Sequence, residues 1–155
     1  MSLESNLQQE QVIHLDLNRF AAVEIGTSVR QTIEKMRRTS HHCAVVLDQG
    51  TLVGIFTDRD ILRKVVDAPD TWEKTIEEVM TYSPISVDSM DSADKALALM
   101  DKKHFRNVPV VDQNGVVLGN LTHYAIIKYL ADRFPESVYN LPPDPEQLSH
   151  IRDGA

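Results

Sequence analysis

Residues 53–61 read Val-Gly-Ile-Phe-Thr-Asp-Arg-Asp-Ile, and the same stretch recurs at residues 118–126 as Leu-Gly-Asn-Leu-Thr-His-Tyr-Ala-Ile. The matching register extends upstream at a spacing of 64 residues, which becomes 65 once Asn114 is inserted in a turn. Self-similarity of this extent indicates that one structural unit is present twice. The copies differ at one informative position, because Thr57 is kept as Thr122 whereas Asp60 becomes Ala125.

The first copy is expected to follow the order β-α-β-β-α. Apolar residues recur at i, i+4 and i+7 in Val29, Ile33 and Met36, which is the spacing of one buried helix face. The expected elements are a strand at 21–25, a helix capped by Thr27 or Ser28, strands at 43–47 and 51–56, and a helix from Thr57 to about 66.

The second copy repeats this order behind an added lead-in. Its expected elements are a linker helix at 72–80, a strand at 84–87, a helix at 92–102, strands at 108–111 and 116–121, and a last helix at 122–132. Each copy is too small to bury its sheet alone, so the two are expected to share a contact.

These elements divide the chain into four segments. We predict an N-terminal extension at 1–11, a first repeat at 12–68, a linker helix with the second repeat at 69–134, and a Pro-rich tail at 135–155. Residues 12–15 are expected to form a short helix or strand that packs on the repeats. The polar composition of the tail is typical of an extended or disordered segment.

Composition excludes several classes of protein. The chain has 155 residues and a formal net charge of −7, which disfavours a general nucleic-acid or anionic membrane partner, although a local basic face such as Lys35, Arg37 and Arg38 stays open. The single cysteine, Cys43, excludes an internal disulfide. No apolar run approaches the ~20 residues of a membrane span, and no secretory signal is visible. We therefore expect a soluble, cytoplasmic protein.

The order of elements, the stretch at 53–61 and the turn Val-Pro-Val-Val-Asp-Gln-Asn-Gly at 108–115 together resemble the CBS domain, named after cystathionine beta-synthase. The likeness covers about residues 12–134. It is strong at residues 79–85, Val-Met-Thr-Tyr-Ser-Pro-Ile, which match the lead-in segment of the family, and weak at residues 15–20. Paired copies are called a Bateman module.

This resemblance implies an α+β fold in which two β-α-β-β-α repeats pack sheet to sheet with pseudo-two-fold symmetry. It further implies a regulatory, energy-sensing module that binds AMP, ADP, ATP or S-adenosylmethionine, has no catalytic cofactor, and associates as a flat homodimer. The orientation of that dimer, head-to-head or head-to-tail, stays open.

Thr57 and Asp60 stand where a strand runs into a helix, and two interpretations of this pair are open. The Thr57 hydroxyl can donate to a phosphate oxygen, and the Asp60 carboxylate can accept from both ribose hydroxyls. The alternative is a capping box, in which both side chains satisfy backbone amides. The resemblance favours ligand contact, because the Thr-x-x-Asp position of the family is its ribose-phosphate position.

The resemblance also implies which residues face this pair across a cleft between the repeats. The predicted nucleotide-binding set is Thr57, Asp60, Ile55, Arg59, Thr81, Ser83, Pro84, Ile85, Arg106 and Asn107. Ile55 and Ile85 are expected to sandwich the adenine, and Arg106 is the preferred phosphate-binding cation. Arg59 is the second candidate, with an exposed, solvated charge as the alternative.

The other cleft is expected to be degenerate. It would pair Thr122 and Ala125 with Arg19, Phe20, Ala21 and His42, so both the ribose carboxylate and the Thr-x-x-Pro of the lead-in are missing. One main nucleotide site per chain is the resulting hypothesis.

The remaining groups of polar and aromatic residues give weaker evidence of a functional site. His41, His42 and Cys43 alternate faces on entering a strand, so they cannot converge on one metal ion, and Cys43 is expected to be a small buried residue. Asp58 and Asp60 point apart on a helix and have no accompanying nucleophile, so paired-carboxylate hydrolysis is disfavoured. Trp72 is expected to anchor packing.

Three functions therefore compete. The first is a regulatory nucleotide sensor that acts in trans on an unidentified protein partner, since no catalytic or transport domain is visible. The second is a ligand-free dimerisation or protein-interaction module in which Asp60 serves only as a cap. An enzyme is a distant third, because no nucleophile, base or metal set is seen.

Overall fold

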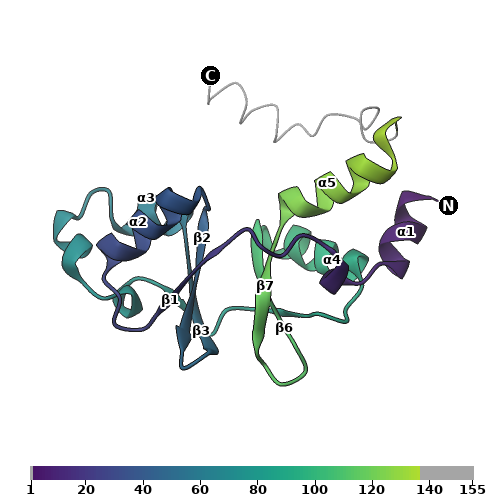
Figure 1. Ribbon diagram of the computed structural model, residues 1–155. Helices are drawn as coiled ribbons and strands as arrows, with labels where there is room; N and C mark the ends of the chain where they lie inside the picture. The colour runs from purple at the N-terminus through teal and green to yellow at the C-terminus, as the bar shows by residue number, and fades with distance from the viewer. Residues whose placement is uncertain (1, 137–155) are drawn as a thin grey trace.

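The computed structural model describes residues 2–136, which form two similar halves lying side by side (Figure 1). The first half contains β1 Ala21–Glu24, α2 Val29–Thr39, β2 Cys43–Asp48, β3 Thr51–Thr57, α3 Asp58–Lys64 and β4 Thr81–Tyr82. The second half contains β5 Val87–Asp88, α4 Ala93–Lys103, β6 Asn107–Val111, β7 Val117–Thr122 and α5 His123–Arg133. The predicted α+β class is confirmed.

The two sheets share one topology. In the first, β1 runs parallel to β2, and β2 and β3 pair antiparallel, with β4 at the edge of β3. In the second, β5 runs parallel to β6, and β6 pairs antiparallel with β7. Each β hairpin carries a register shift at the equivalent place, between Val46 and Leu47 and between Val110 and Val111. A shared bulge supports the duplication more strongly than apolar alternation does.

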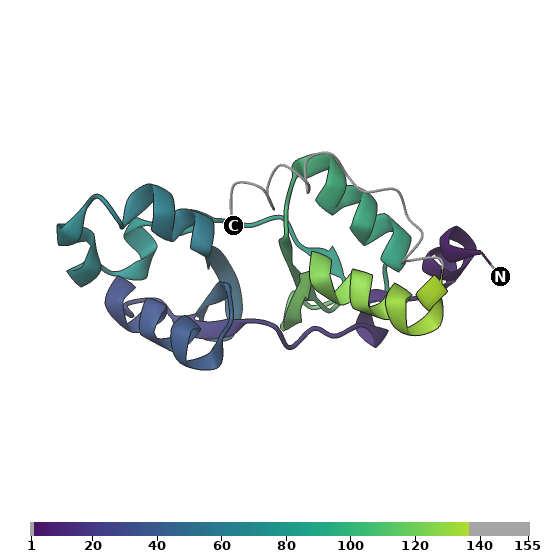
Figure 2. The ribbon, with the colours of Figure 1, turned by 90° about the horizontal axis from the view of Figure 1, so that it is seen from above.

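Seen from above, the strands of the two halves face one another and the helices lie on the outer sides (Figure 2). Each sheet therefore buries one face under its own helices. Phe56 and Ile76 lie in the core of the first half, and Met100 and Ile126 lie in the core of the second. The sheet-to-sheet arrangement with pseudo-two-fold symmetry is as predicted.

The lead-in segments are exchanged between the halves. Val12 and Leu15, which precede the first repeat, pack in the core of the second, and Ile76 and Val79 pack in the core of the first. Equivalent backbone hydrogen bonds hold both segments. The N–H of Ala93 donates to the carbonyl of Glu10 at 2.8 Å, as the N–H of Val29 donates to that of Lys74 at 2.8 Å.

Several predicted elements differ from those observed. The linker helix at 72–80 is wrong: the segment forms two short 3-10 helices, Pro69–Glu73 and Ile76–Glu78. Its backbone bonds outward instead, since the carbonyl of Lys74 accepts from Val29 and the N–H of Ile76 donates to Thr27. The strand at 84–87 shrinks to β5, because residues 83–86 cross from one sheet to the other after Ser83, whose φ is 46°. Residues 12–14 form a 3-10 helix.

The N-terminal extension begins with α1, Leu3–Gln9, which the sequence analysis did not anticipate. The Ser2 side chain accepts from the N–H of Ser5 at 3.1 Å and caps the helix, and Leu7 is buried against the second half. The tail lies outside the described residues from position 137 onward. No helix among residues 2–136 has the length and apolar character needed to cross a bilayer.

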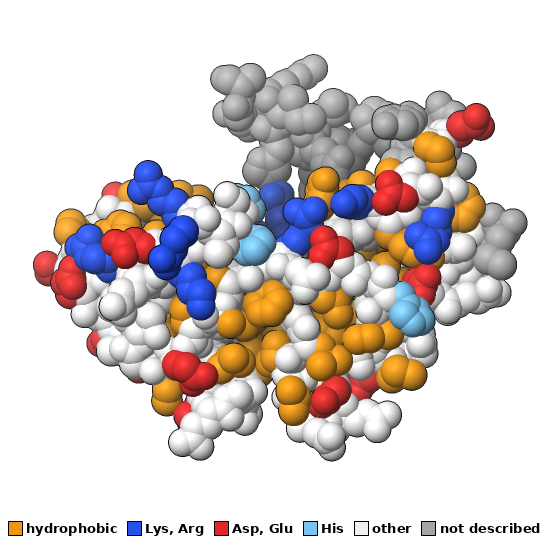
Figure 3. All heavy atoms as spheres, viewed as in Figure 1, with side chains coloured by type: hydrophobic (Ala, Val, Ile, Leu, Met, Phe, Trp, Pro, Cys, Tyr) orange, Lys and Arg blue, Asp and Glu red, His pale blue; other side chains and the backbone are white. Residues whose placement is uncertain are grey.

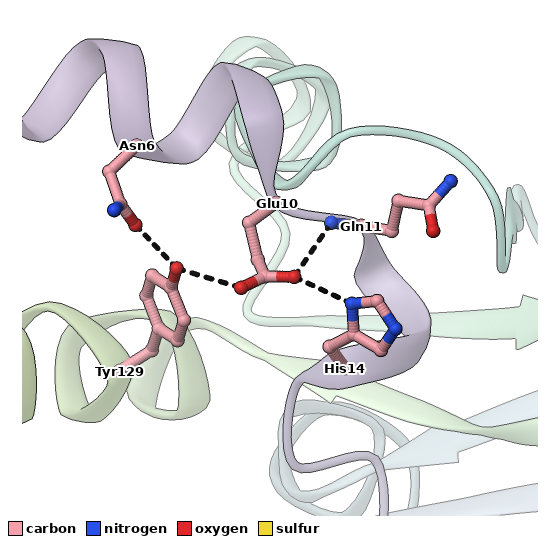
Figure 4. Close-up of polar contacts among 5 residues, drawn as sticks. All are labelled: Asn6, Glu10, Gln11, His14 and Tyr129. Carbon is pink, nitrogen blue, oxygen red and sulfur yellow. Dashed lines mark hydrogen bonds and ion pairs between the residues drawn. The ribbon is translucent and has the colours of Figure 1, made fainter.

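Glu10 fastens the N-terminal segment to α5 (Figure 4). Its carboxylate accepts from Tyr129 at 2.9 Å, from the N–H of Gln11 at 3.0 Å, and lies 2.7 Å from His14 Nδ1. Burial alone would raise the pKa of Glu10, but the hydrogen bonds from His14, Tyr129 and Gln11 outweigh it and lower that pKa. Burial and the neighbouring Glu10 raise the pKa of Tyr129.

We expect Glu10→Gln to lower the free energy of unfolding by about 1 kcal/mol at pH 7, because hydrogen bonds to a charged acceptor are lost. A lowered pKa in the folded state stabilises the protein above the ordinary value of 4.5, and this contribution is lost as the pH falls through the folded pKa. The difference between wild type and variant in urea denaturation should therefore shrink below pH 4.5. Glu34→Gln, at an exposed position on α2, is the control. A pH-independent difference would contradict this assignment.

Candidate functional site

Thr57 and Asp60 lie at the junction of β3 and α3. Thr57 has extended backbone geometry, with φ −125° and ψ 170°. It is the last residue of β3 and directly precedes α3. Its N–H donates to Asp60 Oδ2 at 3.0 Å, and its hydroxyl lies 3.5 Å from the same oxygen. Asp60 therefore makes the capping contact that was one of the two interpretations of this pair.

Lys64 completes the surroundings of the carboxylate, and the sequence analysis did not select it. Its Nζ lies 3.2 Å from Asp60 Oδ1 and donates to the carbonyl of Val79 at 2.7 Å. The signal was available, because residues at i and i+4 share a helix face. The Asp60 side chain is only 14% exposed, so this contact holds the carboxylate in a defined position.

The lead-in of the second repeat lies directly beside β3. Thr81 pairs with Ile55 and Tyr82 with Gly54 across the β3–β4 ladder, and the N–H of Ser83 donates to the carbonyl of Val53 at 3.1 Å. The structure thus brings the strand that carries Thr57 next to the segment that carries Thr81 and Ser83.

The side chains of this segment differ in exposure. Thr81 and Ser83 are exposed, Pro84 is half-buried, and Ile85 is 42% exposed, which is high for an isoleucine. Ile55 is almost fully buried. A ligand at this place would meet Ile85 readily, whereas Ile55 offers it only a small part of its surface.

Arg106 and Asn107 lie at the beginning of β6. The carbonyl of Arg106 accepts from the N–H of His123 at 3.1 Å, and the exposed guanidinium has no carboxylate partner among residues 2–136. No hydrogen bond or ion pair within this described part joins Arg106 or Asn107 directly to Thr57 or Asp60. Basic and histidine side chains gather at the upper edge of the junction between the halves (Figure 3). Arg59 is exposed on α3, as its alternative interpretation expects.

The residues predicted for the second cleft pair with their own neighbours. The Arg19 guanidinium stacks over the ring of Tyr124 at 4.4 Å and donates through Nε to Asp16 at 3.1 Å. Thr122 is occupied as a helix cap, since its hydroxyl accepts from the N–H of Ala125 at 3.0 Å. Tyr124 stands where the first repeat has Arg59, so aligning the two repeats would have revealed it.

The remaining predicted residues of the second cleft are Phe20, Ala21 and His42. Phe20 is half-buried and Ala21 begins β1 as a buried residue. His42 is exposed, and its Nδ1 lies 3.7 Å from Asp58 Oδ2. None of them supplies a carboxylate equivalent to Asp60.

The surroundings of Cys43 and Trp72 explain these two residues by packing. Cys43 is fully buried, and burial raises the pKa of its thiol far above the ordinary value. Among residues 2–136 no three His, Cys, Asp or Glu side chains are placed to hold a metal ion. Trp72 lies under Arg30, whose guanidinium is 5.3 Å from the ring and 2.7 Å from Glu73.

A groove of about 360 Å³ lies on the helical side of the first half. It runs between α2 and α3, and its walls include Met36, His41 and Ile61. None of the predicted nucleotide-binding residues lines it, and His42 is the one residue of the second cleft that does.

The chain is similar to known proteins over most of its described residues. The profile of the CBS domain family matches residues 14–67 and 76–132. Arabinose 5-phosphate isomerase KdsD of Francisella tularensis is 31% identical over 111 residues, which are 72% of this chain and 34% of that protein. The CBS domain-containing protein YhcV of Bacillus subtilis is 29% identical over 97 residues, covering 63% of this chain and 69% of that protein.

Solved structures agree with the fold. CBSX2 of Arabidopsis thaliana, crystallised in complex with AMP, superposes with a TM-score of 0.69 at 26% identity, covering 80% of this chain and 98% of that chain. An uncharacterised conserved protein from Pyrococcus horikoshii shares the fold with a TM-score of 0.72 at 20% identity, over 79% of this chain and 92% of that chain. The chain spans about a third or less of the length of several curated relatives that it matches.

Proposed function

Because the chain belongs to the CBS domain family, we propose that it is a regulatory module that binds one adenosine nucleotide per chain in the cleft beside β3 and α3. Nucleotide binding would bias the geometry of the repeats or of a dimer, and a protein partner would read that change. AMP, ADP, ATP and S-adenosylmethionine are the ligands to be compared.

The asymmetry between the two clefts carries this proposal. The cleft beside α3 keeps a positioned carboxylate, Asp60, and the segment that carries the exposed Thr81 and Ser83 pairs with β3, the strand that leads into α3. The equivalent cleft beside α5 has Ala125 in that position and is occupied by the Arg19–Tyr124 pair. A ribose needs paired acceptors for its hydroxyls, and only the first cleft supplies them.

The capping contacts of Asp60 are compatible with this role. Asp60 Oδ2 accepts from the Thr57 N–H, but each carboxylate oxygen has two lone pairs and can accept a second hydrogen bond. Lys64 Nζ also lies 3.2 Å from Asp60 Oδ1 and helps to orient the carboxylate. A bound ribose would add contacts to a carboxylate that is already in place, which lowers the entropic cost of binding.

A thermal denaturation panel with AMP, ADP, ATP, adenosine, NAD and S-adenosylmethionine tests the proposal. Ligand at 100 times its dissociation constant adds about 2.7 kcal/mol to the native state, which is a rise of roughly 5–10 °C in Tm for a domain of this size. AMP and adenosine form a matched pair that isolates the contribution of the phosphate. No shift with any of the six compounds contradicts the proposal.

A second candidate, a ligand-free interaction module, is favoured by one observation. Asp60 is already satisfied by the N–H of Thr57 and by Lys64, so the local structure needs no ligand to be stable. A flat panel would favour this candidate, and the dimer proposed next is common to both.

We further propose that the module associates as a homodimer through the outer face of α3 and α5. Apolar side chains are exposed on both helices: Leu62 is 70% exposed and Val66 57% on α3 and the turn after it, and Ile127 is 39% exposed on α5. Leu62 and Ile127 occupy equivalent positions of the two repeats. Exposed apolar residues grouped in this way are typical of an interface.

We expect Leu62→Asp to convert the dimer to a monomer, because a carboxylate would have to be desolvated at the interface. The molar mass, measured by light scattering after size exclusion, should fall by half. Met90→Asp is the matched control, because Met90 is also exposed, at 54%, but lies in the turn after β5. An unchanged mass for the Leu62 variant would place the interface elsewhere.

A further inference from the structure

Asn120 is a fully buried polar residue at the contact between the two sheets. It lies on β7 at the position that Ile55 holds in the first repeat, and its exposed fraction is 0%. Its Nδ2 donates to Asn107 Oδ1 at 3.1 Å and to the carbonyl of Arg19 at 3.4 Å. Its backbone N–H donates to the carbonyl of Leu17 at 2.9 Å.

The side-chain oxygen of Asn120 has no hydrogen-bond partner among residues 2–136. An unpaired buried acceptor destabilises a fold, and an apolar residue of similar volume would avoid this cost, as Ile55 does in the equivalent position. The stability of the sheet contact therefore does not explain this asparagine. Its two donated hydrogen bonds are what an apolar residue cannot replace.

Those two bonds join residues of different clefts. Asn107 stands at the start of β6 and belongs to the proposed nucleotide cleft. Arg19 lies in the segment that crosses to β1, and its guanidinium stacks on Tyr124 in the second cleft. The chain of contacts thus runs from Asn107 through the Asn120 amide to the Arg19 backbone and then to Tyr124.

We propose that Asn120 couples the two clefts, so that the occupancy of the nucleotide cleft and the state of the Arg19–Tyr124 pair depend on one another. The inference rests on the proposed function for the identity of the ligand, but not for the link itself. A displacement of Asn107 changes the geometry of an amide that also holds the Arg19 carbonyl. The amide is enclosed on all sides, so it cannot relax toward solvent.

This makes Asn120 a positioning residue that acts between the two clefts. The Arg19–Tyr124 pair occupies the place where a second ligand would otherwise lie. Because coupling is reciprocal, loosening the pair must also change the affinity for the nucleotide.

A ligand-free experiment tests the link by itself. Arg19→Ala removes the guanidinium from Tyr124, and we expect it to shift the NMR signals of the Asn107 side-chain amide and of the Val108 N–H. In the Asn120→Leu background the same substitution should leave those signals unchanged. Equal shifts in both backgrounds, or no shift in either, would overturn the proposal. Asn107→Ala, which breaks the link from its other end, is the second variant if Asn120→Leu does not fold; with it, the Val108 N–H alone is read.

A double-mutant cycle with AMP tests the consequence for binding. Arg19→Ala and Asn120→Leu should each lower the affinity for AMP, and their effects should be non-additive by roughly 2- to 100-fold, the range found for residues in one network. Asn114→Leu, in an exposed turn, is the control. Additive effects contradict the coupling while leaving nucleotide binding intact. If wild type binds another compound of the thermal panel and not AMP, the cycle is run with that compound. If it binds none of the six, the proposed function fails and the ligand-free arm still decides the link.

Discussion

Asp60→Ala is expected to weaken the binding of AMP by at least about 100-fold. Two hydrogen bonds from ribose hydroxyls to a carboxylate contribute about 1.5–3 kcal/mol each, and 100-fold corresponds to about 2.7 kcal/mol. Asp60 is 14% exposed and held by Lys64 and by the N–H of Thr57, so its carboxylate has a defined position before the ligand binds. Calorimetric titration of wild type and variant with AMP measures this loss directly.

The same substitution removes a helix cap, and the control must separate the two effects. Loss of the contact with the Thr57 N–H should cost about 1 kcal/mol of stability, so the titration is made well below the melting temperature of the variant. Asp67→Ala removes an equal charge from an exposed position just beyond α3 and should bind AMP like wild type. Undiminished binding in Asp60→Ala would leave the capping interpretation as the full account of this residue.

Gly119→Ala is expected to lower the free energy of unfolding by about 3 kcal/mol, and Gly54→Ala by only about 1 kcal/mol. Both glycines meet an exchanged lead-in segment, but the neighbours differ. A Cβ on Gly119 would lie 2.5 Å from the carbonyl oxygen of Leu17 and 2.5 Å from its Cβ. A Cβ on Gly54 would meet only the side chain of Met80, which is flexible and can move aside.

The backbone of Leu17 cannot retreat without cost, because its carbonyl accepts from the N–H of Asn120. Urea denaturation of the two variants gives the comparison, with an unchanged m-value required for the midpoints to be read as stabilities. The paired glycines act as controls for one another. Equal costs at the two positions would contradict the asymmetry between the rigid and the flexible lead-in contacts.

The duplicated architecture could be predicted from sequence because the repeat carries several independent signals. The pair Thr57 and Thr122, the turns before β3 and β7, and the stripe of Val29, Ile33 and Met36 all specify the same unit. These are local patterns, and local patterns predict helices and strands directly. The comparisons with CBS proteins confirm the family that the motifs indicated.

The exchange of the lead-in segments could not be predicted in the same way. Val12 and Ile76 are apolar residues of short turns, and nothing in their spacing says which of two similar cores they enter. The linker at 72–80 was predicted as a helix for a related reason. Its apolar residues have helical spacing, but its backbone bonds to Thr27 and Val29 of the neighbouring element, and this tertiary pairing overrides the local preference.

The residues of the candidate site also fall into two groups, those that a local motif predicts and those that depend on the fold. Thr57, Asp60, Thr81 and Ser83 were selected from a motif, and the strand pairing of β3 with β4 brings their segments together. Lys64, Tyr124 and Asn120 were not selected, because a lysine, a tyrosine and an asparagine have many ordinary roles on a protein surface. The partner of Lys64 lies only four positions away, but Arg19, the partner of both Tyr124 and Asn120, lies 105 and 101 positions from them and becomes known only from the fold.

The number of AMP molecules bound per chain tests the central claim most directly. Calorimetric titration of the wild-type protein should give one site per chain, because one cleft has Asp60 and the other has Ala125 and the Arg19–Tyr124 pair. Two equivalent sites per chain would contradict the account, since the cleft beside α5 would then bind the ligand without a ribose carboxylate.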